Sequence, residues 1–295
     1  MSVKPVRKAV LPVAGFGTRV LPATKSVPKE MLTVVDRPAL QYVVDEALAA
    51  GITHIVFVTG RNKGAIEDYF DRAFELEVTL DAKRKTAILD ELMQTVPKAG
   101  SVSFVRQQSP LGLGHAIWCA RDIIGDEPFA ILLPDVLIKS EQSCLAQMME
   151  AYDRVGGNII AVDAVPEDKI SSYGVIAPDE SAAKDGRLTK MTGMVEKPAA
   201  EDAPSNLKIT GRYILQPEIM ALLRDQEAGA GGEIQLTDAM ARMMGSQSFH
   251  AFEYAGQDYD CGSKAGYFEA VAAYAIDHPS IGDEAREIMR GLLDK

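Results

Sequence analysis

VLPVAGFGTR, residues 10–19, decides the fold of this chain, because an apolar β-strand pattern runs directly into a glycine loop and an arginine. A second cation, Lys29, follows in the segment Pro28-Lys29-Glu30-Met31. Residues 1–30 hold six basic side chains and one acid, whereas the whole chain has a formal net charge of −11. Backbone N–H groups of a glycine turn can approach phosphate oxygens, and neighbouring cations neutralise their charge. The stretch therefore predicts a phosphate-binding loop at the end of a strand.

The glycine loop matches neither of the two common nucleotide-binding motifs. It lacks the Gly-Lys-Ser/Thr ending of a P-loop, and Val20 stands where the third glycine of a dinucleotide fingerprint belongs. Asp36 follows Gly15 at about the spacing of a ribose-binding acid, so a nicotinamide dehydrogenase is one alternative. Asp36-Arg37-Pro38 is more typical of a turn into a helix. Together with the missing glycine, this counts against a dehydrogenase.

Composition excludes several classes of protein. A sequence pI near 4.9 argues against nucleic acid or an anionic membrane as the main partner, since both require an extended basic surface. The chain starts without an apolar signal core, and no stretch approaches the roughly 18 uninterrupted apolar residues of a membrane span. The three cysteines, Cys119, Cys144 and Cys261, have no Cys-x-x-Cys spacing and indicate neither a disulfide framework nor a zinc site. We therefore expect a cytoplasmic protein with no membrane partner.

The apolar pattern predicts an α/β fold. Runs typical of buried parallel strands lie at about 6–13, 54–60, 101–107 and 129–136, and helical patterns lie between them, near 38–50, 62–74, 113–124 and 140–155. This alternation predicts a Rossmann-like, mostly parallel mixed central sheet with helices on both faces.

From about residue 157 the pattern changes to strands without full helices between them. These strands are expected at 157–165, 173–177, 188–196, 209–215 and 249–254, as a mixed or antiparallel extension of the same sheet. No long linker or low-complexity tract interrupts the chain, so we expect one continuous domain over 1–295, with subregions 1–156 and 157–262 and a helical arm at 263–295 broken at Pro279. The arm packs either on its own domain or on another subunit, through an apolar face expected to contain Tyr267, Phe268, Val271, Tyr274 and Ile276.

Polar residues follow several predicted strands, where ligands bind in open α/β sheets. Gln107 precedes a glycine-containing loop; its amide offers both a donor and an acceptor, which suits the edge of a pyrimidine base, although an ordinary loop is the alternative. His115, at the start of the next helix, is expected to be structural. Asp135 closes one strand and Asp260 lies in Tyr259-Asp260-Cys261-Gly262. Two carboxylates are suitable Mg²⁺ ligands, but aspartates at strand ends also serve as caps.

Three further residues indicate a sugar phosphate site. Glu196 and Lys197 are adjacent at a strand end, so their side chains should diverge to opposite faces unless the backbone is irregular there. A carboxylate could accept hydrogen bonds from sugar hydroxyls beside a lysine that holds the phosphate; a surface turn is the alternative. Gly174 lies where a sugar ring could pack against the backbone.

Nine segments, in order, carry a resemblance to a known family. They are AGFGTR at 14–19, PKEM at 28–31, GLGH at 112–115, LPD at 133–135, YGV at 173–175, VEKP at 195–198, GRY at 211–213, GEIQLTD at 232–238 and YDCG at 259–262. The chain resembles the bacterial UTP:glucose-1-phosphate uridylyltransferases, within the sugar-phosphate nucleotidyltransferases. The resemblance covers nearly the whole chain and implies a nucleotidyltransferase fold similar to that of the glycosyltransferase-A enzymes.

The resemblance also implies roles for particular residues. It places the nucleotide in residues 1–156 and the sugar phosphate in residues 157–262. The residues implied for the nucleotide are Ala14, Gly15, Gly17, Thr18, Arg19, Lys29, Gln107 and Gly112, with Arg19 and Lys29 acting on the triphosphate. Those implied for glucose 1-phosphate are Gly174, Glu196 and Lys197, and those implied for Mg²⁺ are Asp135 and Asp260. A homodimer or homotetramer is implied as well.

The sequence leaves two candidates for the nucleotide substrate, UTP and dTTP. Pro28-Lys29-Glu30 and the stretch 232–238 favour UTP, because the related thymidylyltransferases usually carry Ser-Lys-Gln at the first place. Gln108-Ser109-Pro110-Leu111, in contrast, resembles the thymidylyl branch. A glucose-1-phosphate thymidylyltransferase that uses dTTP is therefore the alternative function. The reaction type is the same in both.

Overall fold

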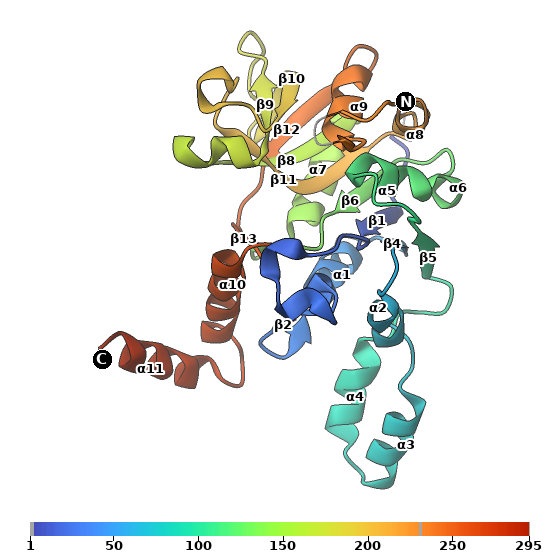
Figure 1. Cartoon of the computed structure of the whole chain (residues 1–295), viewed down its shortest axis with the longest axis vertical. Helices are drawn as coiled ribbons and strands as arrows, with labels where there is room; N and C mark the ends of the chain where they lie inside the picture. Colours follow the sequence, from blue (N-terminus) through green and yellow to red (C-terminus); the bar gives the residue numbers. More distant parts are fainter. Residues whose placement is uncertain (1–2, 230–231, 295) are drawn as a thin grey trace.

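A nine-stranded mixed sheet forms the centre of the computed structural model, which describes residues 3–229 and 232–294 (Figure 1). The strand order is β5-β4-β1-β6-β11-β8-β12-β10-β9. The strands are β1 Lys8–Pro12, β4 His54–Thr59, β5 Val102–Arg106, β6 Phe129–Leu132, β8 Asn158–Ala164, β9 Gly174–Pro178, β10 Leu188–Glu196, β11 Leu207–Leu215 and β12 Phe249–Glu253.

The first four strands in this order are parallel, as the β-α alternation predicts. β11 then runs antiparallel to both β6 and β8, β12 is parallel to β8, and β10 and β9 pair in antiparallel fashion. The predicted mixed extension after residue 157 is therefore confirmed. All nine strands except β10 and β11 run in the same direction.

Helices cover both faces of the sheet, because neighbouring strand residues point to opposite sides. In β1, Ala9 and Leu11 join a core with α1 (Ala39–Ala49), α7 (Cys144–Val155) and α10 (Lys264–Ile276). Val10 points to the other face, where the core contains α5 (Leu113–Cys119), α6 (Arg121–Ile124), α8 (Ile219–Arg224) and α9 (Leu236–Met243). Two helix layers around a mixed sheet confirm the predicted α/β class.

Two predicted elements are shorter than expected. The helix expected at 62–74 ends early as α2 (Gly64–Tyr69), and a helical hairpin of α3 (Phe74–Ala82) and α4 (Thr86–Gln94) follows and extends from the body (Figure 1). Phe74, Val78 and Ile88 of this hairpin are exposed, so their apolar character does not mark a core-facing stripe. The strand expected at 129–136 is interrupted by a turn at Pro134, which cannot donate a ladder hydrogen bond.

After that turn the chain forms β7 (Val136–Lys139), which pairs with β13 (Gln257–Asp260) outside the main sheet. β2 (Thr33–Val34) and β3 (Arg37–Pro38) form another small pair. The prediction that the chain after residue 157 lacks full helices between its strands was wrong, because α8 and α9 lie there. Both are short, with six and eight residues, and no element was predicted between residues 215 and 249.

The C-terminal arm consists of α10 and α11 (Gly282–Leu293), with the break at Pro279 as predicted. Tyr267, Val271 and Tyr274 pack against the core of their own domain beneath α10, whereas Phe268 is 74% exposed and lies outside that packed face. α11 reaches away from the sheet (Figure 1). Among the residues that the structure describes, no helix has both the length and the apolar character needed to cross a membrane.

Candidate active site

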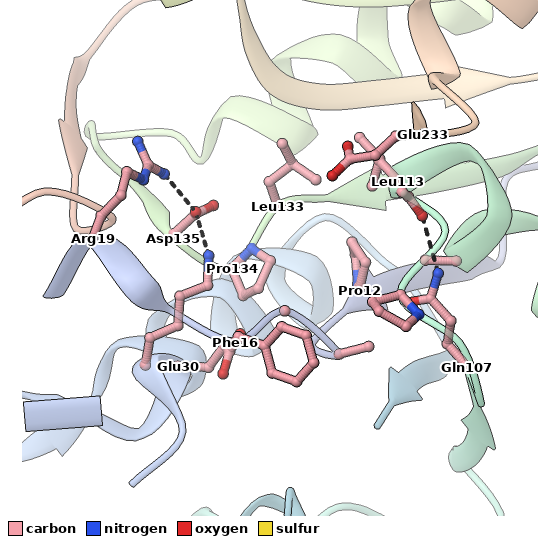
Figure 2. A pocket seen from close by; sticks show the side chains of 16 residues that line it. Pro12, Phe16, Arg19, Glu30, Gln107, Leu113, Leu133, Pro134, Asp135 and Glu233 are labelled. Carbon is pink, nitrogen blue, oxygen red and sulfur yellow. Dashed lines mark hydrogen bonds and ion pairs between the residues drawn. The ribbon is translucent and has the colours of Figure 1, made fainter. Parts of the chain in front are cut away.

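A pocket of about 460 Å³ lies where β1, β5 and β6 end (Figure 2). Seven residues predicted for the nucleotide or the metal line it: Ala14, Gly15, Arg19, Lys29, Gln107, Gly112 and Asp135. Figure 2 shows Arg19 and Asp135 on one side and Gln107 on the other. The pocket therefore lies beyond the carboxyl ends of parallel strands, where ligands bind in sheets of this kind.

Arg19 and Lys29 converge on Asp135. Lys29 Nζ lies 2.6 Å from Asp135 Oδ2, and Arg19 Nη2 lies 3.6 Å from the same oxygen. The Lys29 and Asp135 side chains are mostly buried, at 18% and 16% exposure, whereas Arg19 is 63% exposed. Arg19 is therefore free to turn towards an entering anion, while Lys29 is held in place.

Both members of the Lys29–Asp135 pair are charged at neutral pH. Burial by itself would raise the pKa of Asp135, but the Lys29 ammonium and then Arg19 outweigh it, and the pKa is lowered below 3.8. Burial would lower the pKa of Lys29, but the carboxylates of Asp135 and Glu30 outweigh it, and the pKa is raised above 10.5. An incoming triphosphate therefore meets a charged Lys29 ammonium that is paired with a charged Asp135 carboxylate.

Asp260 lies beside Asp135 because of strand register. In the β7–β13 pair, Asp260 is opposite Val136, and the Cys261 N–H donates to the Asp135 carbonyl at 2.8 Å. Arg19 Nη1 lies 3.7 Å from Asp260 Oδ2. Gly262 leaves room for these side chains, since a Cβ at that position would lie 2.5 Å from Arg19 Nη2, 2.9 Å from Asp260 Oδ1 and 3.1 Å from Asp135 Oδ2.

This pair of carboxylates fits a divalent cation of the Mg²⁺ kind. Both supply oxygen ligands, and the mostly exposed Arg19 guanidinium lies within 4 Å of each carboxylate. Among residues 3–229 and 232–294, no group of three or more His, Cys, Asp or Glu side chains has metal-binding geometry. Mg²⁺ commonly takes one or two carboxylates and completes its coordination with phosphates and water, so two are sufficient.

The rest of the glycine loop supports the pocket without lining it. Gly17 has φ +65°, and a Cβ there would lie 3.0 Å from Lys29 Cβ, so only glycine lets the loop pack against Lys29. Thr24 Oγ1 donates to the Gly17 carbonyl at 2.7 Å. Thr18 is exposed at the start of a short 3₁₀ turn, Thr18–Val20. Neither Gly17 nor Thr18 belongs to the pocket wall.

Gln107 is buried and fixed. Its Nε2 donates to the Gly112 carbonyl at 3.0 Å and to His115 Nδ1 at 3.0 Å, which leaves the side-chain carbonyl for a ligand. His115 is thus structural, as expected, and burial followed by the nearby Arg121 lowers its pKa. Its hydrogen bond orients the amide that was predicted to read the base.

The segment that leads into α9 packs on this base loop. Gly112 has φ +98°, and a Cβ on it would lie 2.7 Å from Glu233 Cβ. The Ile234 N–H donates to the Leu111 carbonyl at 2.7 Å, and the Gly114 N–H donates to the Ile234 carbonyl at 2.8 Å. The GEIQLTD motif therefore closes one side of the pocket, and Glu233 lines it (Figure 2).

Gly174, Glu196 and Lys197 form a second cluster outside the pocket wall. Thr237 Oγ1 donates to Glu196 Oε2 at 2.7 Å, and a Cβ on Gly174 would lie 3.1 Å from that oxygen. Lys197 has φ +46°, and its Nζ lies 3.6 Å from Glu196 Oε1. The backbone is therefore irregular at Lys197, and the two charged side chains meet where regular strand geometry would separate them.

Tyr213 and Glu30 are buried next to the predicted site residues, and no role was predicted for either from the sequence. Tyr213 is buried between the clusters: burial raises its pKa, and the carboxylates of Glu196 and Asp135 raise it further. Glu30 is buried below Lys29, with Oε2 2.8 Å from Lys63 Nζ and Oε1 without a hydrogen-bond partner among the described residues. Burial raises the pKa of Glu30 despite Lys63 and Lys29. Tyr213 lies in the GRY motif at 211–213 and Glu30 in the PKEM motif at 28–31, and these motifs were the sequence signal that could have pointed to them.

Comparisons with known proteins agree with this geometry. A family model described as nucleotidyl transferase matches residues 8–276. A UTP–glucose-1-phosphate uridylyltransferase of Komagataeibacter xylinus is 50% identical over 89% of this chain and 91% of its own length. The protein of the same name from Bacillus subtilis is 47% identical over 99% of both chains.

Solved structures give the same result. A UDP-glucose pyrophosphorylase from Acinetobacter baumannii superposes with a TM-score of 0.90 at 48% identity, over 97% of this chain and 99% of that one. A UTP-bound structure from the same organism gives 0.89 over 96% and 98%. A putative glucose-1-phosphate thymidylyltransferase from Bacillus anthracis is only 20% identical, with a TM-score of 0.70, and shares the fold. The chain belongs to the nucleotidyl transferase family and, within it, to the bacterial UTP–glucose-1-phosphate uridylyltransferases.

Proposed function

We propose that this chain transfers the uridylyl group of UTP to glucose 1-phosphate and that the pocket beside Lys29 and Asp135 holds the nucleotide. A phosphate oxygen of the sugar phosphate attacks the α-phosphorus of UTP, the bond to the β-phosphate breaks, and pyrophosphate leaves. UDP-glucose is the other product. The pairing of Lys29 with Asp135 at the end of β6 is the observation that carries the proposal. In this proposal the fold is Rossmann-like and glycosyltransferase-A-like, and both substrates bind at one edge of the sheet.

The main obstacle to this reaction is repulsion between two anions. Two unit charges about 4 Å apart repel by about 4 kcal/mol at an effective dielectric of about 20, and here a dianion approaches a triphosphate. The Lys29 ammonium and the Arg19 guanidinium offset this repulsion at the triphosphate, and Lys197 offsets it at the sugar phosphate. No protein nucleophile is required, because the sugar phosphate is itself an anionic nucleophile. Catalysis is then positioning and charge stabilisation.

Asp135 and Asp260 would hold Mg²⁺ when it is bound. The ion supplies additional positive charge for the phosphates. Arg19, which lies near both carboxylates, would then be available to contact the triphosphate.

The base and sugar have separate recognition sites in this proposal. The backbone of Ala14 and Gly15, the Gln107 carbonyl and the Gly112 loop contact the base, with Gly17 and Thr18 shaping the loop. Glu196, held by Thr237, accepts hydrogen bonds from sugar hydroxyls above Gly174. Residues 1–156 thus bind the nucleotide, residues 157–262 bind the sugar phosphate, and the arm 263–295 is available for assembly of a homodimer or homotetramer. Three free cysteines agree with a cytoplasmic location.

The test is pyrophosphate release by purified protein with Mg²⁺ and glucose 1-phosphate, comparing UTP with dTTP, each with and without EDTA. We expect release with UTP that EDTA abolishes. A preference for dTTP would transfer the assignment to the thymidylyl reaction, and no release from either would refute the proposal. A residual rate with EDTA equal to that with Mg²⁺ would refute the metal assignment.

The sugar assignment has its own test in Glu196→Ala. We expect this variant to raise the KM for glucose 1-phosphate by more than about tenfold, since a hydrogen bond to a charged group contributes about 1.5–3 kcal/mol. The KM for UTP should change much less. Equal increases in both constants would contradict a role of Glu196 in sugar binding.

A further inference from the structure

The turn that carries Asp135 is held from behind by Arg212 of β11, a residue that the proposed reaction does not use. Arg212 Nη1 donates to the Leu133 carbonyl at 3.0 Å, and Nη2 donates to the Val136 carbonyl at 2.8 Å. These two carbonyls flank Pro134-Asp135 on both sides. The Arg212 side chain is fully buried, with 0% exposure. A single guanidinium therefore fixes both ends of the turn.

Glu46 of α1 fixes the guanidinium in turn. Arg212 Nε lies 3.1 Å from each Glu46 oxygen, and Nη2 lies 2.7 Å from Oε2. Glu46 Oε1 also accepts the Leu145 N–H at 3.1 Å, in the first turn of α7. The arginine is thus fixed relative to α1 and α7, two helices of one face of the sheet. Its planar fork donates to both Glu46 oxygens and, at the same time, to the Leu133 and Val136 carbonyls, whereas a lysine ammonium has only three donors and no fixed plane.

The neighbouring backbone restrains the same turn. The Leu133 N–H donates to the Gly211 carbonyl at 2.9 Å. Gly211 has φ +84°, and a Cβ there would lie 3.0 Å from the Leu133 side chain, so the Gly211-Arg212 pair fits closely against the turn. On the opposite side, the Cys261 N–H donates to the Asp135 carbonyl. Asp135 is therefore placed by contacts to its backbone from two sides.

We propose that Arg212, oriented by Glu46, is a positioning residue that sets the location of the Asp135 carboxylate for metal binding and for its pairing with Lys29. The inference rests on the proposed function, since that function assigns Asp135 its ligand. A buried ion pair by itself is weak evidence of a stabilising role, because well-packed apolar side chains often replace such a pair without loss. Only the arginine, however, can donate to both carbonyls of the turn.

This difference gives a test with two variants and a matched control. Arg212→Lys keeps the positive charge but loses the planar guanidinium. The double variant Arg212→Met/Glu46→Leu fills the same space with apolar side chains and removes the two guanidinium donors to the Leu133 and Val136 carbonyls. The control is Lys8→Met, because Lys8 likewise bridges a carboxylate, Glu127, and two carbonyls, those of Ile123 and Ile124, at the other end of β1. Affinity for Mn²⁺ is measured by electron paramagnetic resonance, together with thermal unfolding, kcat and KM. The part of the Mn²⁺ binding signal that is lost in Asp135→Ala is assigned to the site at Asp135.

We expect the double variant to keep a cooperative unfolding transition and to bind Mn²⁺ roughly 10–100-fold more weakly, the usual effect of removing a residue that orients a metal ligand. Its kcat should fall by a similar factor, with little change in the KM for glucose 1-phosphate, while Lys8→Met should match the parent. Parent-like Mn²⁺ affinity and kcat in a folded double variant would overturn the proposal. So would a parent chain whose Mn²⁺ binding is insensitive to Asp135→Ala. If the parent bound Mn²⁺ at Asp135 but released no pyrophosphate, the proposed function would fail, and the Mn²⁺ titrations would still decide the role of Arg212.

Discussion

Of the two cations predicted to act on the triphosphate, Lys29 and Arg19, Lys29 is held more closely. Its Nζ is 2.6 Å from Asp135, and its side chain is largely buried, in contrast to the exposed Arg19. A fixed charge needs no reorganisation when a triphosphate binds, which is the property that makes electrostatic catalysis effective. Lys29 should therefore contribute more to turnover than any other side chain of the glycine loop region.

We expect Lys29→Met to lower kcat by roughly 10²–10³-fold, the usual effect of removing one preorganised group that stabilises transition-state charge. Pyrophosphate release under saturating UTP is the measurement. Lys25→Met is the control, because Lys25 lies only four residues away but is exposed and outside the pocket wall. Equal losses in the two variants would show that general charge near the loop, and no specific contact, is responsible.

The Lys29–Asp135 pair also predicts how stability depends on pH. The pKa of Asp135 is lowered below 3.8, so its contribution is present above that pH and is lost as the pH falls through the lowered value. The pKa of Lys29 is raised above 10.5, so its contribution is present below that pH and is lost as the pH rises through the raised value.

Asp135→Asn should therefore destabilise the protein by about 2 kcal/mol in the neutral range, where a charged hydrogen bond is lost. The difference in unfolding free energy between parent and variant should be constant between about pH 5 and 9 and should shrink in acid. Urea unfolding at several pH values measures it. If the difference in unfolding free energy instead grew as the pH fell, a stabilising Lys29–Asp135 ion pair would be contradicted.

At the scale of elements, the site is made where loops from distant regions of the chain pack on each other. The base loop before α5 and the segment that leads into α9 exchange two backbone hydrogen bonds, through Leu111, Gly114 and Ile234. The β7–β13 pair brings Asp260 next to the turn that carries Asp135. Each of these junctions depends on a glycine that allows close approach.

We expect Gly112→Ala to raise the KM for UTP and to destabilise the fold, because its Cβ would collide with Glu233 and its φ is +98°. With φ +98° and ψ 177°, Gly112 has an extended, positive-φ backbone that is essentially restricted to glycine and costs another residue about 1–3 kcal/mol. Thermal unfolding and UTP saturation curves measure the two effects.

Gly100→Ala is the matched control for that variant. Gly100 has φ +77° but nothing within 4 Å of its Cβ position, so it isolates the cost of backbone strain. We expect it to lose some stability and to keep a parent-like KM for UTP. If both alanine variants behaved alike, the contact with Glu233 would have no role in forming the pocket.

For the whole molecule, the C-terminal arm presents apolar side chains to solvent. Phe268 is 74% exposed on α10, and Ile288, Leu292 and Leu293 are exposed on α11. Large exposed apolar side chains on both helices of this arm favour a surface that is covered in an assembly. This agrees with the proposed homodimer or homotetramer.

Light scattering after size exclusion should therefore give a mass that is a multiple of 31.9 kDa. Phe268→Asp should shift the distribution towards the monomer, whereas Val155→Asp, at a singly exposed apolar residue at the end of α7, should not. A monomeric parent would refute the proposed assembly. An unaffected oligomer in Phe268→Asp would place the interface elsewhere.

Sequence reasoning by itself determined the β-α alternation, the parallel half of the sheet and the glycine loop with its two cations. These features depend on neighbouring residues: apolar runs of strand length, helical periodicity and the conformations that glycine and proline permit. The candidate residues were also identified from their chemical type and motif. Seven of those predicted for nucleotide or metal line one pocket.

Tertiary structure alone decided which of these residues meet. Nothing local in the sequence places Asp260 beside Asp135, because that contact depends on the register of two strands more than a hundred residues apart. Two other contacts are equally long-range: Glu46 pairs with Arg212, and the Glu233 segment packs on Gly112. The hydrogen bond between Gln107 and His115 depends on the direction of their side chains. Short helices such as α8 and α9 were missed because their stability comes from packing against the sheet, and propensity over so few residues carries little information.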